Sequence, residues 1–275
     1  MDKKTFFRHY PLRKADSNKF DNGRVFIVGG SYGMAGACIL NIIGARSVGA
    51  SYIEVLLPES IYPIVASNEI TAVYHPDDLS NKGFPEAFKK ADSVAFGSGM
   101  TNHSLKEEYL RYVLKNAKVP VTVDAEGLHI LSDNDGLYKL NRKMILTPHL
   151  GEFSLLTGLS IDDIKKNKEE IAVNFAKEKK VTLVLKGPST LIVSGRGKVT
   201  VNDSGNEALA RAGSGDVLTG MIAGLCALYE DPYRAAVDAV WLHGHLADEA
   251  IRTRSKEVFD LTLYPEFADK FFKER

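Results

Sequence analysis

The sequence contains few cysteines and no long hydrophobic run. Cys38 and Cys226 are the only cysteines among 275 residues, and both lie in apolar segments with a helical pattern. We interpret them as small core residues rather than as a disulfide or a catalytic nucleophile. No stretch approaches the roughly 20 apolar residues of a membrane span. The charged segment 1–19 also lacks the apolar centre of a signal peptide. We therefore expect a cytoplasmic protein with no membrane partner.

The chain also lacks an excess of charge of either sign. It has 35 basic and 35 acidic residues, so no net field favours nucleic acid or an anionic membrane as a partner. Local groups would have to hold an anionic substrate. Hydrophobic residues make up 44% of the sequence, which at this length is enough for one large core and is typical of a globular enzyme. Because neither a repeat nor a low-complexity linker interrupts the chain, we predict a single domain over residues 1–275.

Several familiar catalytic motifs are absent. The sequence has no Gly-x-x-x-x-Gly-Lys-[Ser/Thr] phosphate loop, no Gly-x-Ser-x-Gly elbow and no supported Ser-His-Asp order. The glycines at 30, 33 and 36 lack the spacing of a dinucleotide-binding loop, and Glu54 lies within the next predicted strand rather than at its end. His243 and His245 have no third ligand nearby, so we interpret them as core or helix-surface residues. These absences argue against a Rossmann dehydrogenase, a P-loop enzyme and a histidine metal site.

Short apolar strands alternate regularly with helical segments along the chain. Near-continuous apolar strands between helices predict an α/β fold, with a mostly parallel central sheet covered by helices on both faces. The turn Ser194–Gly197 predicts a late hairpin. The expected strands are 24–30, 52–57, 93–97, 119–124, 144–147, 181–186, 191–193 and 198–201, and the expected helices are 35–48, 105–115, 152–157, 161–179, 216–229 and 232–252.

Glycine or polar residues directly follow five of the expected strands. Ligands of such sheets bind beyond the carboxyl ends of the strands, so this clustering predicts a functional site at that edge. The competing interpretation is that they are turn residues of a purely structural sheet. The residues are Gly29–Ser31, Gly97–Gly99, Asp124, Thr147–His149 and Lys186–Gly187.

The most informative segment is Ala212–Gly220, with the sequence AGSGDVLTG. Its small residues let consecutive backbone N–H groups turn inward around an anion, and the helix expected from Asp216 adds its positive dipole at the same point. Asp216 is then either a helix cap or a base beside a phosphate. We refer to Gly213–Gly215 as the anion loop.

Three other segments have both a structural and a functional interpretation. Gly29–Ala37 permits tight packing of a helix on the sheet or close approach of a substrate to the backbone. Thr147–Glu152 forms an ordinary helix start, or it places His149 against a substrate and Glu152 in a water–Mg²⁺ network. Lys186–Thr190 is a turn, or a loop whose lysine neutralises a nucleotide phosphate. Asn202, Gly205 and Asn206 precede the anion loop. They either line the same ligand pocket or form an ordinary turn.

Taken together, these motifs resemble the ribokinase-like superfamily and, within it, the NAD(P)H-hydrate dehydratases. The similarity extends from about residue 24 to residue 250. It rests on six ordered segments, namely 29–37 (GGSYGMAGA), 97–100 (GSGM), 124–128 (DAEGL), 147–152 (TPHLGE), 185–187 (LKG) and 206–220 (NEALARAGSGDVLTG). The chain departs from the commonest family residues without losing a predicted catalytic group, at Glu126, Leu150, Glu207 and Arg211.

The resemblance implies a repair reaction. NAD(P)H that is hydrated at C6 of its nicotinamide ring carries a hydroxyl that leaves poorly, and phosphorylation turns it into a good leaving group. The implied phosphoryl donor is ADP, converted to AMP, in bacterial members and ATP in eukaryotic ones. We expect ADP for this chain, with Mg²⁺ as cofactor and Glu152 as the best candidate ligand. The resemblance also implies a homotetramer, and we expect the dehydratase domain without the epimerase domain that many bacterial relatives carry.

The resemblance assigns roles to particular residues. Asp216 would be the base that accepts the hydroxyl proton, with its carboxylate ionised at neutral pH. The backbone N–H groups of the anion loop would hold the transferring phosphoryl group. The hydrated substrate would contact Ala37, Gly99, His149 and Asp216. The nucleotide would contact Gly215 and the loop residues Lys186, Gly187, Pro188, Ser189 and Thr190.

Two alternatives stay open at this point. One is a small-molecule kinase of the same fold, acting on a hydroxymethylpyrimidine, a hydroxyethylthiazole or a sugar alcohol. The other is a catalytically silent nucleotide-binding protein, against which the intact glycine run beside Asp216 argues. The sequence also leaves open ADP or ATP as donor, the hydrate of NADH or of NADPH as substrate, and the metal ligands.

Overall fold

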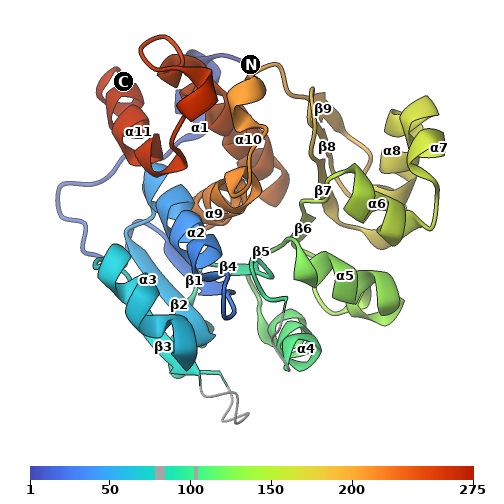
Figure 1. Cartoon of the computed structure of the whole chain (residues 1–275), viewed down its shortest axis with the longest axis horizontal. Coiled ribbons are helices and arrows are strands. Elements are labelled where there is room, and N and C mark those ends of the chain that lie inside the picture. Colours follow the sequence, from blue (N-terminus) through green and yellow to red (C-terminus); the bar gives the residue numbers. More distant parts are fainter. Residues whose placement is uncertain (78–83, 102–104) are drawn as a thin grey trace.

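The central feature of the fold is a nine-stranded sheet in which β8 and β9 form an antiparallel hairpin at one edge (Figure 1). The computed structural model describes residues 1–77, 84–101 and 105–275. The strand order is β3-β2-β1-β4-β5-β6-β7-β8-β9, and the strands from β3 to β7 in this order run parallel. The strands are β1 (Arg24–Val28), β2 (Tyr52–Pro58), β3 (Val73–Asp77), β4 (Ser93–Phe96), β5 (Val121–Val123), β6 (Met144–Leu146), β7 (Thr182–Leu185), β8 (Leu191–Val193) and β9 (Val199–Val201).

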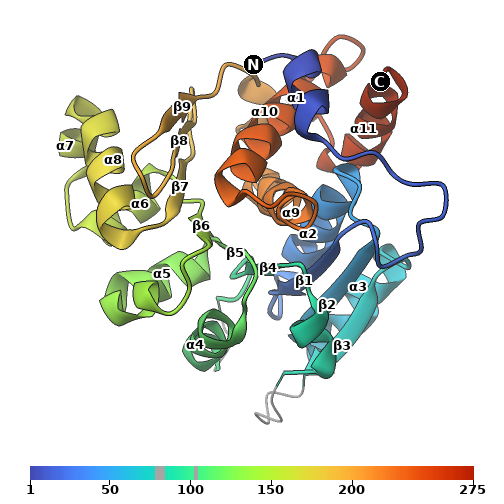
Figure 2. The ribbon, with the colours of Figure 1, turned by 180° about the vertical axis from the view of Figure 1, so that it is seen from behind.

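Helices cover both faces of this sheet, as Figures 1 and 2 show. Successive side chains of β1 point to opposite faces, so Val25 and Ile27 pack with α2 and α3 whereas Phe26 and Val28 pack with α4. The helices α9, α10 and α11 share the face of α2, and α5, α6 and α8 share the face of α4. The α-helices are α1 (Lys3–His9), α2 (Ala35–Ser47), α3 (Tyr62–Asn68), α4 (Lys106–Asn116), α5 (Glu126–Asp133), α6 (Leu150–Thr157), α7 (Ile161–Lys166), α8 (Lys168–Lys179), α9 (Ser214–Cys226), α10 (Pro232–Ala250) and α11 (Tyr264–Lys273).

Helices α2 and α9 pack with their backbones in contact. A Cβ atom on Gly44 would lie 2.1 Å from the carbonyl oxygen of Val217, and one on Gly220 would lie 2.1 Å from that of Asn41. Gly224 is enclosed in the same way. Because a larger side chain does not fit at these positions, glycine sets the separation of the two helices. The loops that precede α2 and α9 are therefore held at a fixed distance from each other.

The expected strands and the expected sheet are confirmed, with small shifts in strand boundaries. The edge strand β3 was not expected, because it is partly exposed and contains Pro76, which is typical of a turn or an edge strand. The interpretation of Cys38 and Cys226 is also confirmed, since both are buried and unpaired. The prediction of a single domain stays a prediction.

The helices differ more from expectation. The helix expected over 161–179 is two helices, because the backbone turns at Asn167 (φ −132°) between α7 and α8. Helix α9 begins at Ser214, two residues before the expected start. The shorter helices α1, α3, α5 and α11 were not expected at all. Among the described residues, no helix has the length and apolar character needed to cross a membrane.

Candidate active site

The carboxyl ends of five parallel strands lie side by side at one edge of the sheet. Strands β1, β4, β5, β6 and β7 are consecutive neighbours, so the residues that follow them meet along a line (Figure 1). The expected clustering of glycine and polar residues at this edge is therefore confirmed in space. It is the region that open α/β sheets use to bind ligands.

Lys186 connects the ends of β5, β6 and β7 at the centre of this edge. Its Nζ donates to Oδ1 of Asp124 over 2.8 Å and lies 3.9 Å from Oε2 of Glu152. The hydroxyl of Thr147 also donates to Oδ1 of the buried Asp124, over 2.8 Å. Burial alone would lower the pKa of Lys186, but the Asp124 and Glu152 carboxylates raise it above its ordinary value. Lys186 is thus a fixed cation, and Oδ2 of Asp124 accepts no hydrogen bond from the described residues.

The anion loop lies against this ion pair. Gly213, with φ +91°, precedes α9, and the helix begins with Ser214. A Cβ atom on Gly215 would lie 3.3 Å from Nζ of Lys186 and 4.0 Å from Oδ2 of Asp124. The backbone of the loop and the positive end of α9 therefore meet the cation at one point, which suits a phosphate group. This arrangement supports the predicted anion site.

Asp216 lies in the first turn of α9 beside the anion loop. Burial and the Asp124 carboxylate raise the pKa of Asp216 to about 7, while the Ser98 hydroxyl and the Lys186 ammonium act in the opposite direction. The sequence predicts an ionised carboxylate at neutral pH, whereas a pKa near 7 leaves it about half protonated there. Ser98 is buried, and its Oγ makes no hydrogen bond of standard geometry to the described residues. A base with a pKa near the working pH suits proton transfer.

The glycine loops after β1 and β4 contact each other. The backbone N–H of Gly30 donates to the carbonyl oxygen of Ser98 over 2.8 Å, and the hydroxyl of Ser31 donates to that of Gly99 over 2.7 Å. A Cβ atom on Gly99 would lie 2.8 Å from the Cβ atom of Ala37. The structure thus brings together Ala37 and Gly99, and their role as substrate contacts stays a prediction.

His149 has a structural role at the start of α6. Its Nδ1 accepts from the backbone N–H of Glu152 over 3.1 Å, and Oε2 of Glu152 accepts from the backbone N–H of His149 over 2.8 Å. This reciprocal capping supports the structural interpretation of the pair. The side chain of His149 is nevertheless 60% exposed, so its imidazole is accessible to a ligand. Its contact with a substrate stays a prediction.

The segment Lys186–Thr190 forms a tight turn after β7. The hydroxyl of Thr190 donates to the carbonyl oxygen of Gly187 over 3.0 Å, and Gly187 and Ser189 have φ angles of +150° and +55°. Gly187, Pro188 and Ser189 are exposed. Their accessible backbone suits contact with a nucleotide, which also stays a prediction.

The donor set at this edge fits Mg²⁺ only if substrate phosphates complete it. No group of three or more His, Cys, Asp or Glu side chains in residues 1–77, 84–101 and 105–275 is arranged to hold a metal ion. Mg²⁺ commonly keeps several waters and binds through one or two carboxylates plus phosphates. Oδ2 of Asp124 and the buried carboxylate of Glu152 could serve in that way, because both carboxylates lie close to Lys186 and Oδ2 of Asp124 also lies close to Gly215 of the anion loop.

The turn before the anion loop is committed to structural contacts. Asp248 of α10 accepts from the backbone N–H of Gly205 and from Nδ2 of Asn206, both over 2.8 Å. Asn202 donates through Nδ2 to the carbonyl oxygen of Ser204. These contacts favour the turn interpretation over a role of these residues in lining a ligand pocket.

His243 lies against the start of α9, which the sequence did not predict. Its Nε2 is 3.5 Å from the hydroxyl of Ser214, and its ring stacks on Tyr264 with a centroid distance of 5.2 Å. Burial lowers the pKa of His243 to about 4, so the ring is neutral at physiological pH. No local signal could reveal this contact, because 29 positions separate the two residues.

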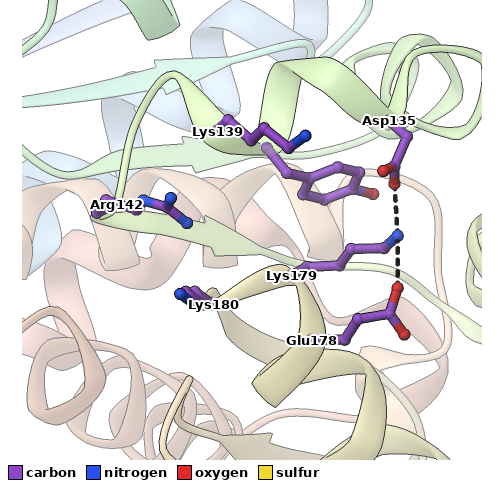
Figure 3. A pocket seen from close by; sticks show the side chains of 7 residues that line it. Asp135, Lys139, Arg142, Glu178, Lys179 and Lys180 are labelled. Carbon is purple, nitrogen blue, oxygen red and sulfur yellow. Dashed lines mark hydrogen bonds and ion pairs between the residues drawn. The ribbon is translucent and has the colours of Figure 1, made fainter.

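Two surface hollows lie away from this edge. One, of about 200 Å³, lies at the amino ends of β6 and β7, and Figure 3 shows Lys179 between Asp135 and Glu178 within it. The other, of about 470 Å³, is lined by residues that precede β4, β5 and β6 and by the end of α9. Neither hollow includes a residue that the sequence predicts for the site.

Comparison with known protein sequences gives a consistent result. A family model described as NAD(P)H-hydrate dehydratase matches residues 25–264. The chain is 36% identical over 256 residues to the bifunctional NAD(P)H-hydrate repair enzyme Nnr of Moorella thermoacetica, covering 90% of this chain and 48% of that protein. It is 33% identical over 238 residues to the ADP-dependent (S)-NAD(P)H-hydrate dehydratase of Bacillus subtilis, covering 86% and 84%. The chain thus spans about half the length of the bifunctional relative.

Comparison with solved structures agrees with the comparison of sequences. The ADP/ATP-dependent NAD(P)H-hydrate dehydratase from Bacillus subtilis, co-crystallised with ATP and Mg²⁺, has a TM-score of 0.87 at 28% identity. The match covers 99% of this chain and 97% of that one. The expected ribokinase-like fold is confirmed as well. Sequence and structure together show that this chain belongs to the NAD(P)H-hydrate dehydratase family.

Proposed function

We propose that this chain catalyses the nucleotide-dependent dehydration of hydrated NADH or NADPH back to the reduced dinucleotide. One observation carries the proposal: the anion loop, the fixed cation Lys186 and the carboxylate Asp216 meet at one edge of the sheet in a member of this family. The first supplies phosphate-binding N–H groups, the second neutralises phosphate charge and the third accepts a proton. Phosphoryl transfer to a hydroxyl group requires these three functions.

The first chemical step is transfer of the terminal phosphoryl group of the nucleotide. The C6 hydroxyl oxygen of the hydrate forms a bond to phosphorus as its proton passes to Asp216, and the bond between phosphorus and the departing AMP breaks. The backbone N–H groups of the anion loop hold the phosphoryl oxygens, and Lys186 balances their charge. When bound, Mg²⁺ supplies further neutralisation of phosphate charge, with Asp124 and Glu152 as its candidate ligands.

The second chemical step is elimination of phosphate. The lone pair of the ring nitrogen expels phosphate from C6, and the proton of C5 then passes to the released phosphate as the double bond of the reduced nicotinamide forms. With ADP as donor the products are NADH or NADPH, AMP and inorganic phosphate. The oxygen of the hydrate leaves within the phosphate, so the overall balance is removal of water from the hydrate and hydrolysis of ADP.

The choice of donor and the cellular setting are further parts of the proposal. The name of the Bacillus subtilis relative describes an ADP-dependent enzyme, and the solved structure of that species' enzyme is described as ADP/ATP-dependent with Mg²⁺. We accordingly propose ADP as the preferred donor and Mg²⁺ as the cofactor. The resemblance to the family also supports a homotetramer that acts in the cytoplasm as one domain.

A coupled assay tests the function. The protein is mixed with hydrated NADH, Mg²⁺ and either ADP or ATP, and the return of reduced-nicotinamide absorbance is followed together with the release of inorganic phosphate. We expect one phosphate per reduced nicotinamide and no reaction without nucleotide. A stable phosphorylated alcohol, formed from a pyrimidine, thiazole or sugar substrate while the hydrate stays untouched, would instead establish the kinase alternative.

A further inference from the structure

Arg211 ties together two segments on either side of the anion loop. One is the turn 205–211, which leads into the loop, and the other is residues 251–263, which connect α10 to α11 and which we refer to as the strap. The guanidinium of Arg211 donates through Nε to the carbonyl oxygen of Ala208 over 2.6 Å and through Nη2 to that of Lys256 over 2.7 Å. Its Nη1 donates to the carbonyl oxygen of Phe259. One side chain therefore holds two backbone carbonyls of the strap and one of the turn.

The strap in turn contacts the anion loop. A Cβ atom on Gly213 would lie 3.2 Å from Cδ1 of Leu261 in the strap and 2.4 Å from Cδ1 of Leu40 in α2. Gly213 is thus held between the strap and α2. The carbonyl oxygen of Arg211 also accepts from the backbone N–H of Ser214 over 3.4 Å, at the first residue of α9. Arg211 consequently acts on the anion loop both through the strap and through its own backbone.

An ion pair also joins the two segments, but it is a weaker link than the hydrogen bonds of Arg211. Glu207 and Lys256 pair between the same two segments, but both side chains are exposed, and exposed ion pairs contribute little to stability. Arg211 is only partly exposed, and three nitrogens of its planar guanidinium each donate to a backbone carbonyl oxygen. A lysine has a single compact ammonium on a flexible stem, so it does not reproduce this geometry.

We propose that Arg211 is a positioning residue for phosphoryl transfer, because it fixes the strap and thereby the direction of the N–H groups in the anion loop. The proposal rests on the proposed function for its kinetic part. Binding of the nucleotide in the ground state also uses the loop 186–190. Stabilisation of the charge that develops on the transferring phosphoryl group depends instead on the direction of the N–H groups in the anion loop. Misalignment of the loop should therefore lower kcat more than it raises the KM for ADP.

Three variants test the proposal against one control. In Arg211→Lys the guanidinium fork is lost, and we expect kcat to fall about tenfold, below the roughly 10²–10³-fold effect of deleting one such donor. The KM for ADP should change much less. Arg211→Met should lower kcat at least as much, and Leu261→Ala should lower it with Arg211 intact, because it removes the strap side chain that contacts Gly213. Glu207→Gln breaks only the exposed ion pair and is expected to match the wild type.

Hydrogen exchange gives a readout that does not depend on activity. In the Arg211 and Leu261 variants, amides of 213–217 should exchange faster together with those of the strap, while Glu207→Gln should leave both segments unchanged. Faster exchange confined to the strap would overturn the proposal, and so would unchanged kcat in a variant whose anion loop exchanges faster. An inactive wild type would instead refute the proposed function, and the exchange of 213–217 would still decide whether Arg211 fixes the loop.

Discussion

Replacement of Asp216 by asparagine should abolish turnover and stabilise the fold at the same time. The amide is nearly the same size as the carboxylate, so the anion loop should keep its shape and nucleotide affinity should persist. Loss of a general base typically lowers the rate by about 10²–10⁴-fold. The stabilisation follows from the raised pKa of the Asp216 carboxyl, which means that the folded protein disfavours the ionised form.

The size of this stabilisation depends on pH in a defined direction. Burial raises the pKa of Asp216 from 3.8 to about 7, so the contribution of Asp216 to the stability of the wild type is most favourable below about pH 4 and becomes less favourable as pH rises to about 7. A shift of about three pH units corresponds to at most about 4 kcal/mol at pH 8, and about 1–2 kcal/mol of this is already lost at pH 5. The advantage of Asp216→Asn should therefore grow by about 2–3 kcal/mol between these two pH values.

Urea unfolding of the wild type and Asp216→Asn at both pH values measures this change in the stability difference. Effects of the substitution that do not depend on pH cancel when the two pH values are compared. Asp16→Asn is the matched control, because Asp16 is an exposed residue of the N-terminal segment. In the same assay series, kcat/KM of the wild type, which reports groups of the free enzyme, should rise with an apparent pKa near 7 as Asp216 ionises. A stability difference that is the same at both pH values would refute the buried-carboxylate argument, and near-normal turnover of Asp216→Asn would end its assignment as the base.

Three further predictions concern the nucleotide site and the fold. Gly215→Val should abolish ADP binding in calorimetry with the circular dichroism spectrum retained, because a Cβ atom there would lie 3.3 Å from Nζ of Lys186; unchanged affinity would place the nucleotide elsewhere. Lys186→Met should weaken ADP binding and move the pH–rate profile to higher pH, because the ammonium lowers the pKa of Asp216; an unmoved profile would contradict this coupling. Gly220→Ala should lower the free energy of unfolding by roughly 1–3 kcal/mol through a clash with Asn41, while Gly136→Ala, where a Cβ atom meets nothing within 4 Å, should not; equal urea midpoints would show that α2 and α9 can separate.

Local patterns in the sequence were sufficient to predict most of the strands and the edge of the sheet at which the candidate site lies. The strands 24–28, 93–96 and 182–185 are buried along their length, so their apolar runs were visible, and the residues after them faced the expected edge. The sequence did not predict strand β3 or helix α3, because each is short, contains proline and leaves apolar side chains exposed. The local sequence of β3 predicts a strand only weakly. Its pairing with β2 stabilises it as a strand, and that pairing cannot be read from the segment itself.

Contacts between distant parts of the chain could not be read from the sequence. Arg211 is visible only as a departure from common family residues, and its partners Lys256 and Phe259 lie 45 and 48 positions away. The raised pKa of Asp216 depends in the same way on burial and on Asp124, which follows strand β5 and lies far from Asp216 in the sequence. A residue type can suggest a role at such positions, but its proton affinity is a property of the assembled site.

The backbone contact between α2 and α9 limits how the enzyme can move. The loop before α2 and the loop before α9 are joined through helices whose backbones touch at Gly44 and Gly220, so the two loops should move as one unit. Closure over a substrate would then come from the side of β6 to β9, where residues 187–189 are exposed. The acceptor and the transferring phosphorus would then be aligned on a rigid platform, and the mobile side would govern when substrates enter and leave.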